Sequence, residues 1–177
     1  MGVQSSFGFT LGRMEKGRLN KITDVPGVRV GHVTRHEGGI NTGVTAILPH
    51  TGDMFHDKCP AASHVINGFG KSIGLVQVNE LGTIETPLLL TNTLSVGTAA
   101  TALVKYMLER NEDIGRDTGT VNPMVFECND GHLNDIRGLH VTEQNALDAL
   151  ANAADDFEEG AVGAGSGMSC YSLKGGI

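Results

Sequence analysis

The sequence predicts a mixed α/β fold in which residues 1–177 form a single domain. Two observations support this prediction. Short apolar runs rich in β-branched residues, which are typical of strands, accompany two longer segments whose apolar residues recur at helical spacing. The chain is also 40% hydrophobic and 19% charged over 177 residues, which is enough for one globular core.

The first half of the chain contains four predicted strand segments. Residues 21–34 read KITDVPGVRVGHVT, and the turn-forming DVPG before an alternating run predicts an early hairpin. Residues 43–49 form a second β-branched run, which a proline closes. Two further runs, at 72–79 and 86–93, show little polar alternation, as is typical of strands covered on both faces. These strands therefore require helices or a second sheet above them.

The second half is predicted to contain two helices and further strands. Residues 95–110 place their apolar residues on one stripe, with Ser95 as the N-cap. Residues 123–128 form a short strand, followed by a polar loop at 129–135. A second helix runs from its N-cap Thr142 to about residue 154. Beyond a glycine-rich stretch, residues 168–173 have the pattern of a buried strand.

Charge and composition exclude several classes of partner. The formal net charge is -7 and no basic run interrupts it, so neither nucleic acid nor an anionic membrane surface is expected. The N-terminal residues lack the apolar core of a secretory signal, and no segment approaches the roughly 18 apolar residues of a membrane span. We therefore expect a cytoplasmic protein. Its cysteines, which form no CxxC pair, are interpreted as structural free thiols.

The sequence contains no cofactor, metal or nucleophile motif in the structural context that such a motif requires. The stretch GAVGAGSG at 160–167 follows a helix and lacks a Gly-Lys-Ser/Thr ending, so we interpret it as a tight bend. His32 and His36 are four residues apart, but that spacing joins ligands on a helix and this segment has the pattern of a strand. No serine lies in a GxSxG motif. The sequence thus implies no cofactor, no metal and no self-contained catalytic triad.

Polar residues beside the buried runs are the remaining candidates for function. Glu80 and Glu85 lie in NELGTIETP between two apolar runs. A carboxylate next to buried strands requires either a compensating polar partner or a functional role. A solvated loop carboxylate is the alternative for both. Asn129 and Asn134 lie in ECNDGHLNDIRG, which ordinary turn chemistry also explains. An amide NH₂ group is, however, also a suitable donor to a developing oxyanion.

Several segments, in their order along the chain, resemble the L-aminopeptidase/D-esterase family, which includes the β-peptidyl aminopeptidases. They are ITDVPGVRVGHVT, TGVTAILP, NGFG, NELGTIETPLLLTNTLSVG, ECNDGHLNDIRGLHV, GAVGAGSGM and KGGI. The resemblance covers most of the chain from Lys21 onward. It implies a four-layer αββα sandwich whose sheets are completed by a second, smaller subunit.

The resemblance further implies a self-cleaving precursor. In the family, the new N-terminal Ser or Thr of the smaller subunit becomes the nucleophile, and the freed amine is its local base. The cut follows a segment like KGGIG, so Gly175, Gly176 and Ile177 correspond to the processing end of the larger subunit. The implied reaction is hydrolysis of N-terminal amino-acid amides, esters or short peptides through an acyl-enzyme.

The resemblance gives roles to three residues. Asn134 corresponds to the oxyanion-hole asparagine, Glu80 to the carboxylate that recognises the substrate amine, and Asn92 to a residue lining the same pocket. The implied partners are a smaller β subunit from the same precursor, in a hetero-octamer of four such pairs, and a small peptide or amide substrate. The stretch from Ser95 to Asn134 is shorter than in longer members of the family, which leaves substrate preference open.

Two other functions stay open at the level of sequence. An acyltransferase of the ornithine acetyltransferase type uses the same kind of nucleophile but passes the acyl group to an amine. An inactive homologue would instead serve as a binding or structural subunit.

Overall fold

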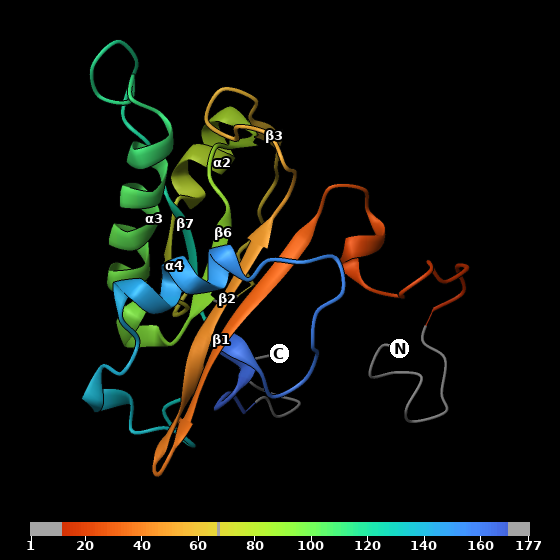
Figure 1. Ribbon diagram of the computed structural model, residues 1–177, viewed down its shortest axis with the longest axis vertical. Coiled ribbons are helices and arrows are strands. Elements are labelled where there is room, and N and C mark those ends of the chain that lie inside the picture. The colour runs from red at the N-terminus through yellow and green to blue at the C-terminus, as the bar shows by residue number, and fades with distance from the viewer. Residues whose placement is uncertain (1–11, 67, 170–177) are drawn as a thin grey trace.

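The structure is a computed structural model that describes residues 12–66 and 68–169 (Figure 1). It confirms a mixed α/β fold. Its main sheet has five strands in the order β1-β2-β6-β7-β4, in which only the β6–β7 pair is parallel among the described residues. The strands are β1 (Arg29–Glu37), β2 (Ile40–Leu48), β4 (Ser72–Ile73), β6 (Leu88–Thr91) and β7 (Met124–Glu127). Strands β3 (Cys59–Pro60) and β5 (Thr83–Ile84) form a separate two-stranded sheet.

The first hairpin lies later in the chain than the sequence predicted. Strands β1 and β2 pair in register from Arg29 opposite Leu48 to Glu37 opposite Ile40, which leaves a two-residue turn of glycines. The expected turn at 24–27 exists but does not join two strands, because a 3-10 helix (Ile22–Asp24) precedes it. The Asp24 carboxylate accepts hydrogen bonds from backbone N–H groups of residues 19 and 21, at 2.9 and 3.2 Å, and these bonds hold the segment in a tight turn.

The prediction of one strand over residues 72–79 is wrong. Strand β4 ends after two residues at Gly74, whose φ of 98° lies in the left-handed region, and helix α2 (Leu75–Leu81) follows. Val78 is buried on the inner side of α2 in a cluster with Met54, Ile84 and Met124. A short apolar run fits a buried helix turn as well as a buried strand, so periodicity could not separate the two.

Helices α3 (Val96–Arg110) and α4 (Glu143–Ala151) confirm the two predicted helices and cover one face of the main sheet (Figure 1). Their alanines and leucines enclose the central core with Val44, Leu89 and Val125 from three strands. Thr142 is the N-cap of α4, as predicted, and its hydroxyl accepts from the Asn145 N–H at 3.3 Å. Helix α4 ends at Ala151 rather than near residue 154.

Ser95 is the N-cap residue of α3, as predicted, but another side chain provides the capping hydrogen bond at this helix start. The Ser95 side chain makes no capping hydrogen bond. The Asn92 side chain caps the 3-10 helix η2 (Thr93–Ser95) instead, accepting from the Ser95 N–H at 2.9 Å. The chain thus enters α3 through an extra turn, which buries both residues.

The glycine-rich stretch is the tight bend that the sequence predicted. Its 3-10 helix η4 (Gly163–Gly165) packs on β1 and β2. The N–H groups of Gly163 and Ala164 donate to the hydroxyls of Thr34 and Thr45, at 2.8 and 3.1 Å. A side chain at Gly43 would collide with the backbone of Gly163, so only glycine permits this close approach. Of the strand predicted over 168–173, residues 168 and 169 are not in a strand and the others lie outside the described residues.

Candidate active site

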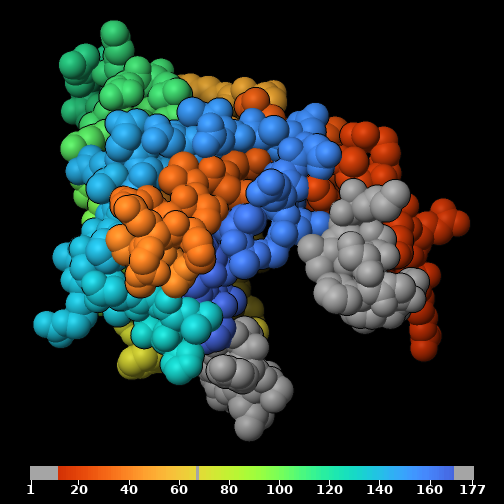
Figure 2. All heavy atoms as spheres, turned by 60° about the horizontal axis from the view of Figure 1, so that its bottom comes forward, coloured from red at the N-terminus to blue at the C-terminus, as the bar shows by residue number. Residues whose placement is uncertain are grey.

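The candidate active site lies where the parallel strands β6 and β7 end. Thr91 and Glu127 are register partners there, and the Cys128 N–H donates to the Thr91 carbonyl at 2.7 Å. Loops that follow neighbouring parallel strands emerge at one edge of a sheet, and the antiparallel β2 begins at this edge. Figure 2 shows the hairpin tip (orange), residues around 130–140 (cyan) and residues around 160–169 (blue) together at this end of the molecule.

Asn134 lies in the loop after β7 and is 7% exposed. Its side-chain oxygen accepts a hydrogen bond from the Asn41 N–H at 2.9 Å, and its own N–H donates to the Asp130 carbonyl at 2.9 Å. The side-chain nitrogen, in contrast, is buried and has no hydrogen-bond partner among the residues that the structure describes. The amide therefore has a fixed orientation and an unused NH₂ group, which is the chemistry that an oxyanion-hole donor requires.

The β1–β2 hairpin holds this loop in place. The Asp135 N–H donates to the Gly39 carbonyl at 3.0 Å, and the Asn41 side-chain NH₂ donates to the Leu133 carbonyl at 2.7 Å. The backbone on both sides of Asn134 is thus attached to the hairpin, through the turn residue Gly39 and through Asn41 near the start of β2. The position of the Asn134 amide depends on the hairpin as much as on its own loop.

Asn92 is at the same edge and is 1% exposed. Its side-chain NH₂ donates to the Thr42 hydroxyl at 3.1 Å, while its side-chain oxygen caps η2. Since Thr42 adjoins Asn41, the start of β2 connects Asn92 to Asn134. The structure thus brings these two predicted site residues to one edge of the sheet. Unlike Asn134, Asn92 uses both polar atoms of its side chain in hydrogen bonds to neighbouring residues there.

Several buried polar atoms at this edge have no hydrogen-bond partner in the part of the chain that the structure describes. They are Thr93 Oγ1, Ser95 Oγ, Glu127 Oε2, both carboxylate oxygens of Asp130, and Asn134 Nδ2. Buried polar atoms without partners are rare in folded proteins, because each costs about 1–3 kcal/mol. Their concentration at this edge leaves several hydrogen-bonding groups available to a further group.

The sequence analysis missed Asp130 and Glu127. Asp130 is 1% exposed, and a side chain at Gly167 would approach its Cβ atom, so the glycine-rich segment packs directly against it. The motif ECNDG had been interpreted as turn chemistry. The available signal was the position of the two carboxylates, Glu127 within a predicted buried strand and Asp130 just after it.

Glu80 does not lie at this edge in the described chain. It is exposed on the last turn of α2, a helix that packs through Val78 near Met124, at the start of β7. Glu85 is 6% exposed and fully paired: its carboxylate accepts from Lys58 Nζ at 2.7 Å and from the Asn122 N–H at 2.8 Å. Glu85 thus has a structural role, and Glu80 is separated from Asn134 by the length of β7.

The two histidines considered for a metal site have different surroundings. His32 Nδ1 is 2.9 Å from the Thr45 hydroxyl and Nε2 is 3.1 Å from the Glu158 carbonyl, while His36 is exposed. Burial lowers the pKa of His32, although the carbonyl and carboxylate of Glu158 oppose this shift. Within residues 12–66 and 68–169, no three potential metal ligands cluster, and no helix has the length and apolar character to span a bilayer.

Comparison with known proteins identifies the family. A model of peptidase family S58 matches residues 20–177. The chain belongs to peptidase family S58. The β-peptidyl aminopeptidase BapA of Sphingosinicella microcystinivorans, for example, is 39% identical over 170 residues, which are 90% of this chain and 42% of that protein. The resemblance on which the sequence analysis relied is therefore confirmed.

Solved structures support the same assignment. The PH0078 protein from Pyrococcus horikoshii OT3 matches with a TM-score of 0.91 at 55% identity, over 94% of this chain and 50% of that one. The chain also matches an L-aminopeptidase D-Ala-esterase/amidase from Ochrobactrum anthropi, which is described as a serine aminopeptidase with a variant of the Ntn-hydrolase fold. The TM-score is 0.82 at 35% identity, and the match covers 91% of this chain and 47% of that one. The chain spans about half the length of these S58 relatives. Gly175, Gly176 and Ile177, the predicted processing end, lie outside the described residues.

Proposed function

We propose that this chain is the larger part of an N-terminal-nucleophile aminopeptidase that hydrolyses amino-acid amides, esters or short peptides, with Asn134 as its oxyanion donor. The buried, oriented and unpartnered NH₂ group of Asn134 carries the proposal. Membership of the S58 family and homology to β-peptidyl aminopeptidases support it. The nucleophile is a Ser or Thr on the smaller β subunit, since this chain spans only about half of its relatives.

In the proposed reaction, the β-subunit hydroxyl attacks the substrate carbonyl while the free amine of the same residue accepts the proton. The carbonyl oxygen becomes an oxyanion and accepts a hydrogen bond from Asn134 Nδ2. Collapse of this intermediate breaks the amide or ester bond, and the leaving group takes the proton from the base. Water then hydrolyses the acyl-enzyme by the same steps and restores the hydroxyl.

The completed molecule is proposed to be a four-layer αββα sandwich. Helices α3 and α4 cover only one face of the main sheet, while α2, the β3–β5 sheet and η4 partly cover the other. A second sheet on that other face would cover Leu90, which is only partly buried among the described residues. The hetero-octamer of four such pairs is part of the same proposal.

Recognition of the substrate amine by Glu80 requires the complete assembly. Glu80 is exposed and distant from Asn134 within one chain, so a neighbouring subunit would have to bring it to a site. Replacing Glu80 with Gln is then expected to raise KM for substrates with a free amine. Equal KM values for the variant and the wild type would remove Glu80 from the site.

Mutation of Asn134 tests the central proposal. In the processed enzyme, Asn134→Ala is expected to lower kcat by about 10²–10³ with little change in KM, because the donor acts mainly on the transition state. Asn122→Ala is the matched control, since the Asn122 side chain donates to Gln77 on the exposed surface at 2.6 Å. An unchanged kcat in Asn134→Ala would overturn the assignment.

A further inference from the structure

A cavity lies at the opposite end of the sheet from Asn134. It has a volume of about 300 Å³, between the end of β2 and the last turn of α3. Arg29 and Leu48, which line it, are register partners at one end of the hairpin, whereas Asn41 holds Asn134 at the other. Because a strand rises about 3.3 Å per residue, roughly 23 Å of β2 separate the two places. The cavity is therefore distinct from the candidate active site.

Two arginines line this cavity without a carboxylate partner. The Arg29 Nε atom is buried and has no hydrogen-bond partner within residues 12–66 and 68–169. Arg110 lies over the Tyr106 ring at 3.5 Å and donates to the Tyr106 carbonyl at 3.2 Å, so its own helix holds it in place. Neither guanidinium forms an ion pair with any residue in the described part of the chain. Unpaired arginines in one cavity are notable in a protein of net charge -7.

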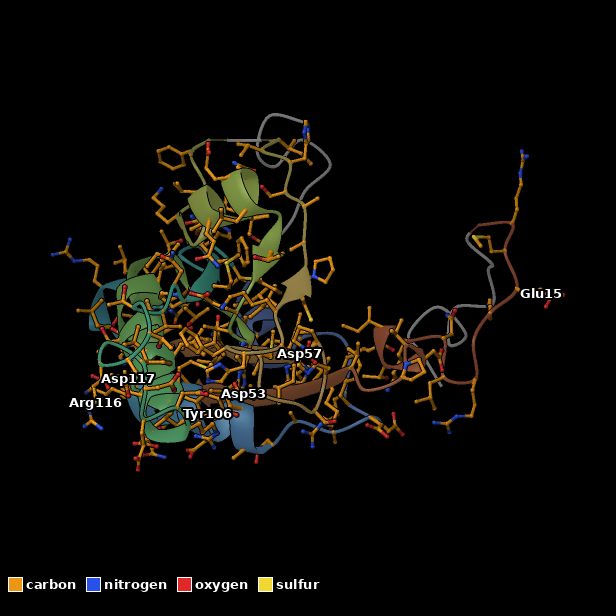
Figure 3. All side chains as sticks on the ribbon, turned by 90° about the horizontal axis from the view of Figure 1, so that it is seen from above. Glu15, Asp53, Asp57, Tyr106, Arg116 and Asp117 are labelled. Carbon is orange, nitrogen blue, oxygen red and sulfur yellow. The ribbon has the colours of Figure 1, made fainter. Side chains whose placement is uncertain are left out.

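The other charged and titratable groups of the cavity do not neutralise the arginines. Both ring nitrogens of His50 are engaged, Nδ1 with the Gly52 N–H at 3.0 Å and Nε2 with the Asp57 carbonyl at 2.9 Å. Asp53, which Figure 3 labels together with Tyr106, accepts from the Phe55 N–H at 3.0 Å, and its other oxygen is 3.9 Å from His56. The lining thus carries two positive charges against one carboxylate.

We propose that this cavity binds a small oxyanion of the carboxylate or phosphate class. Guanidinium groups present planar pairs of N–H donors that match both anions, and such charge-assisted hydrogen bonds are stronger than neutral ones. The cavity has the size of a small-molecule site. Tyr106 and Leu48 provide apolar wall next to the guanidinium groups, which favours a small organic carboxylate over a bare ion. The site is independent of the proposed hydrolysis.

The test uses the complete, processed protein and two probes, succinate and inorganic phosphate, measured by isothermal titration at constant ionic strength. Saturable binding of at least one probe is expected for the wild type. Arg110→Gln and Arg29→Gln should each weaken that binding at least about tenfold, because each removes a charged donor. Arg110 is exposed on the last turn of α3, so Arg110→Gln should keep the fold. An unfolding curve of this variant, measured without the probe, checks that expectation.

Arg116→Gln is the matched control, since Arg116 is an exposed residue outside the cavity lining (labelled in Figure 3). It should bind both probes like the wild type. The proposal is overturned if the wild type shows no saturable binding, or if Arg116→Gln weakens binding as much as Arg110→Gln does. Hydrolytic activity is not a readout here, so failure of this proposal is distinct from failure of the proposed function.

Discussion

At the scale of single residues, Asp130 connects stability with function. Its buried carboxylate has no hydrogen-bond donor in the described part of the chain, and a buried polar group without a partner destabilises a fold. Proteins retain such groups where a ligand or partner uses them. Asp130 lies one turn before Asn134 and its backbone carbonyl positions that loop, so the two residues belong to one structural unit.

Asp130→Asn is expected to raise the free energy of unfolding of the isolated chain by about 1–3 kcal/mol, because the variant removes an unpartnered charge. The same change should lower the activity of the complete enzyme. Denaturant unfolding and steady-state assays measure the two effects, and exposed Asp117→Asn should alter neither. A clear loss of stability in Asp130→Asn would show that the carboxylate has a partner after all.

His32 gives the chain a pH-dependent stability. Its pKa is below the ordinary value of 6.5 in the folded state, so the unfolded chain binds more protons between these two values. The free energy of unfolding should therefore fall as the pH is lowered from about 7 toward 5. His32→Gln should flatten this slope in urea unfolding curves, while His36→Gln, an exposed change on the same strand, should leave it intact. Equal slopes in all three proteins would contradict the assignment to His32.

At the residue level, a motif in the sequence could single out positions, whereas burial, which depends on the fold, could not be predicted. Asn134 and Asn92 were predicted and lie together at one edge. Asp130 was missed because Asn-Asp-Gly is an ordinary turn sequence, and the burial of its side chain depends on contacts with segments distant in sequence. The resemblance assigned Glu80 to the same pocket, and the structure places Glu80 on the exposed last turn of α2, so its role stays a prediction.

At the scale of elements, the long periodic helices and the strand β7 were predictable, because many residues repeat one pattern. The two-residue strands β3, β4 and β5 were not, since their existence depends on partners and not on local propensity. The turn at Gly38 and Gly39 was also missed. A glycine pair between two β-branched runs is a recognised hairpin signal, so this miss was avoidable.

The packing of α4 on β1 depends on a glycine. A Cβ atom at Gly31 would collide with the carbonyl of Ala149 and the N–H of Ala153, so Gly31→Ala should destabilise the chain by about 1–3 kcal/mol. Gly97 in α3 is the matched control, since it is exposed and a Cβ atom there meets nothing within 4 Å. Gly97→Ala should stabilise the chain by about 0.5–1 kcal/mol. Thermal unfolding of both variants measures the contrast, and a neutral Gly31→Ala would refute the close contact.

At the scale of the whole molecule, the unpartnered atoms at the end of β6 and β7 fit a chain that spans about half of its S58 relatives. Association with the proposed β subunit should therefore slow amide hydrogen exchange in residues 129–135, compared with the isolated chain. Residues 115–119, in the exposed loop after α3, serve as the internal control. Unchanged exchange at 129–135 would mean that the subunit contacts another surface.

The attachment of the Asn134 loop to the hairpin tip has a consequence for protein engineering. Two-residue hairpin turns are usually chosen for inserted epitopes and fusion points, because they are exposed and tolerant. Here the Gly39 carbonyl and Asn41 together hold the loop that carries the proposed oxyanion donor. Lengthening this turn would move the proposed oxyanion donor without any substitution at Asn134 itself. The length of the hairpin is therefore a means of tuning the proposed activity, and its tip is a poor location for a tag.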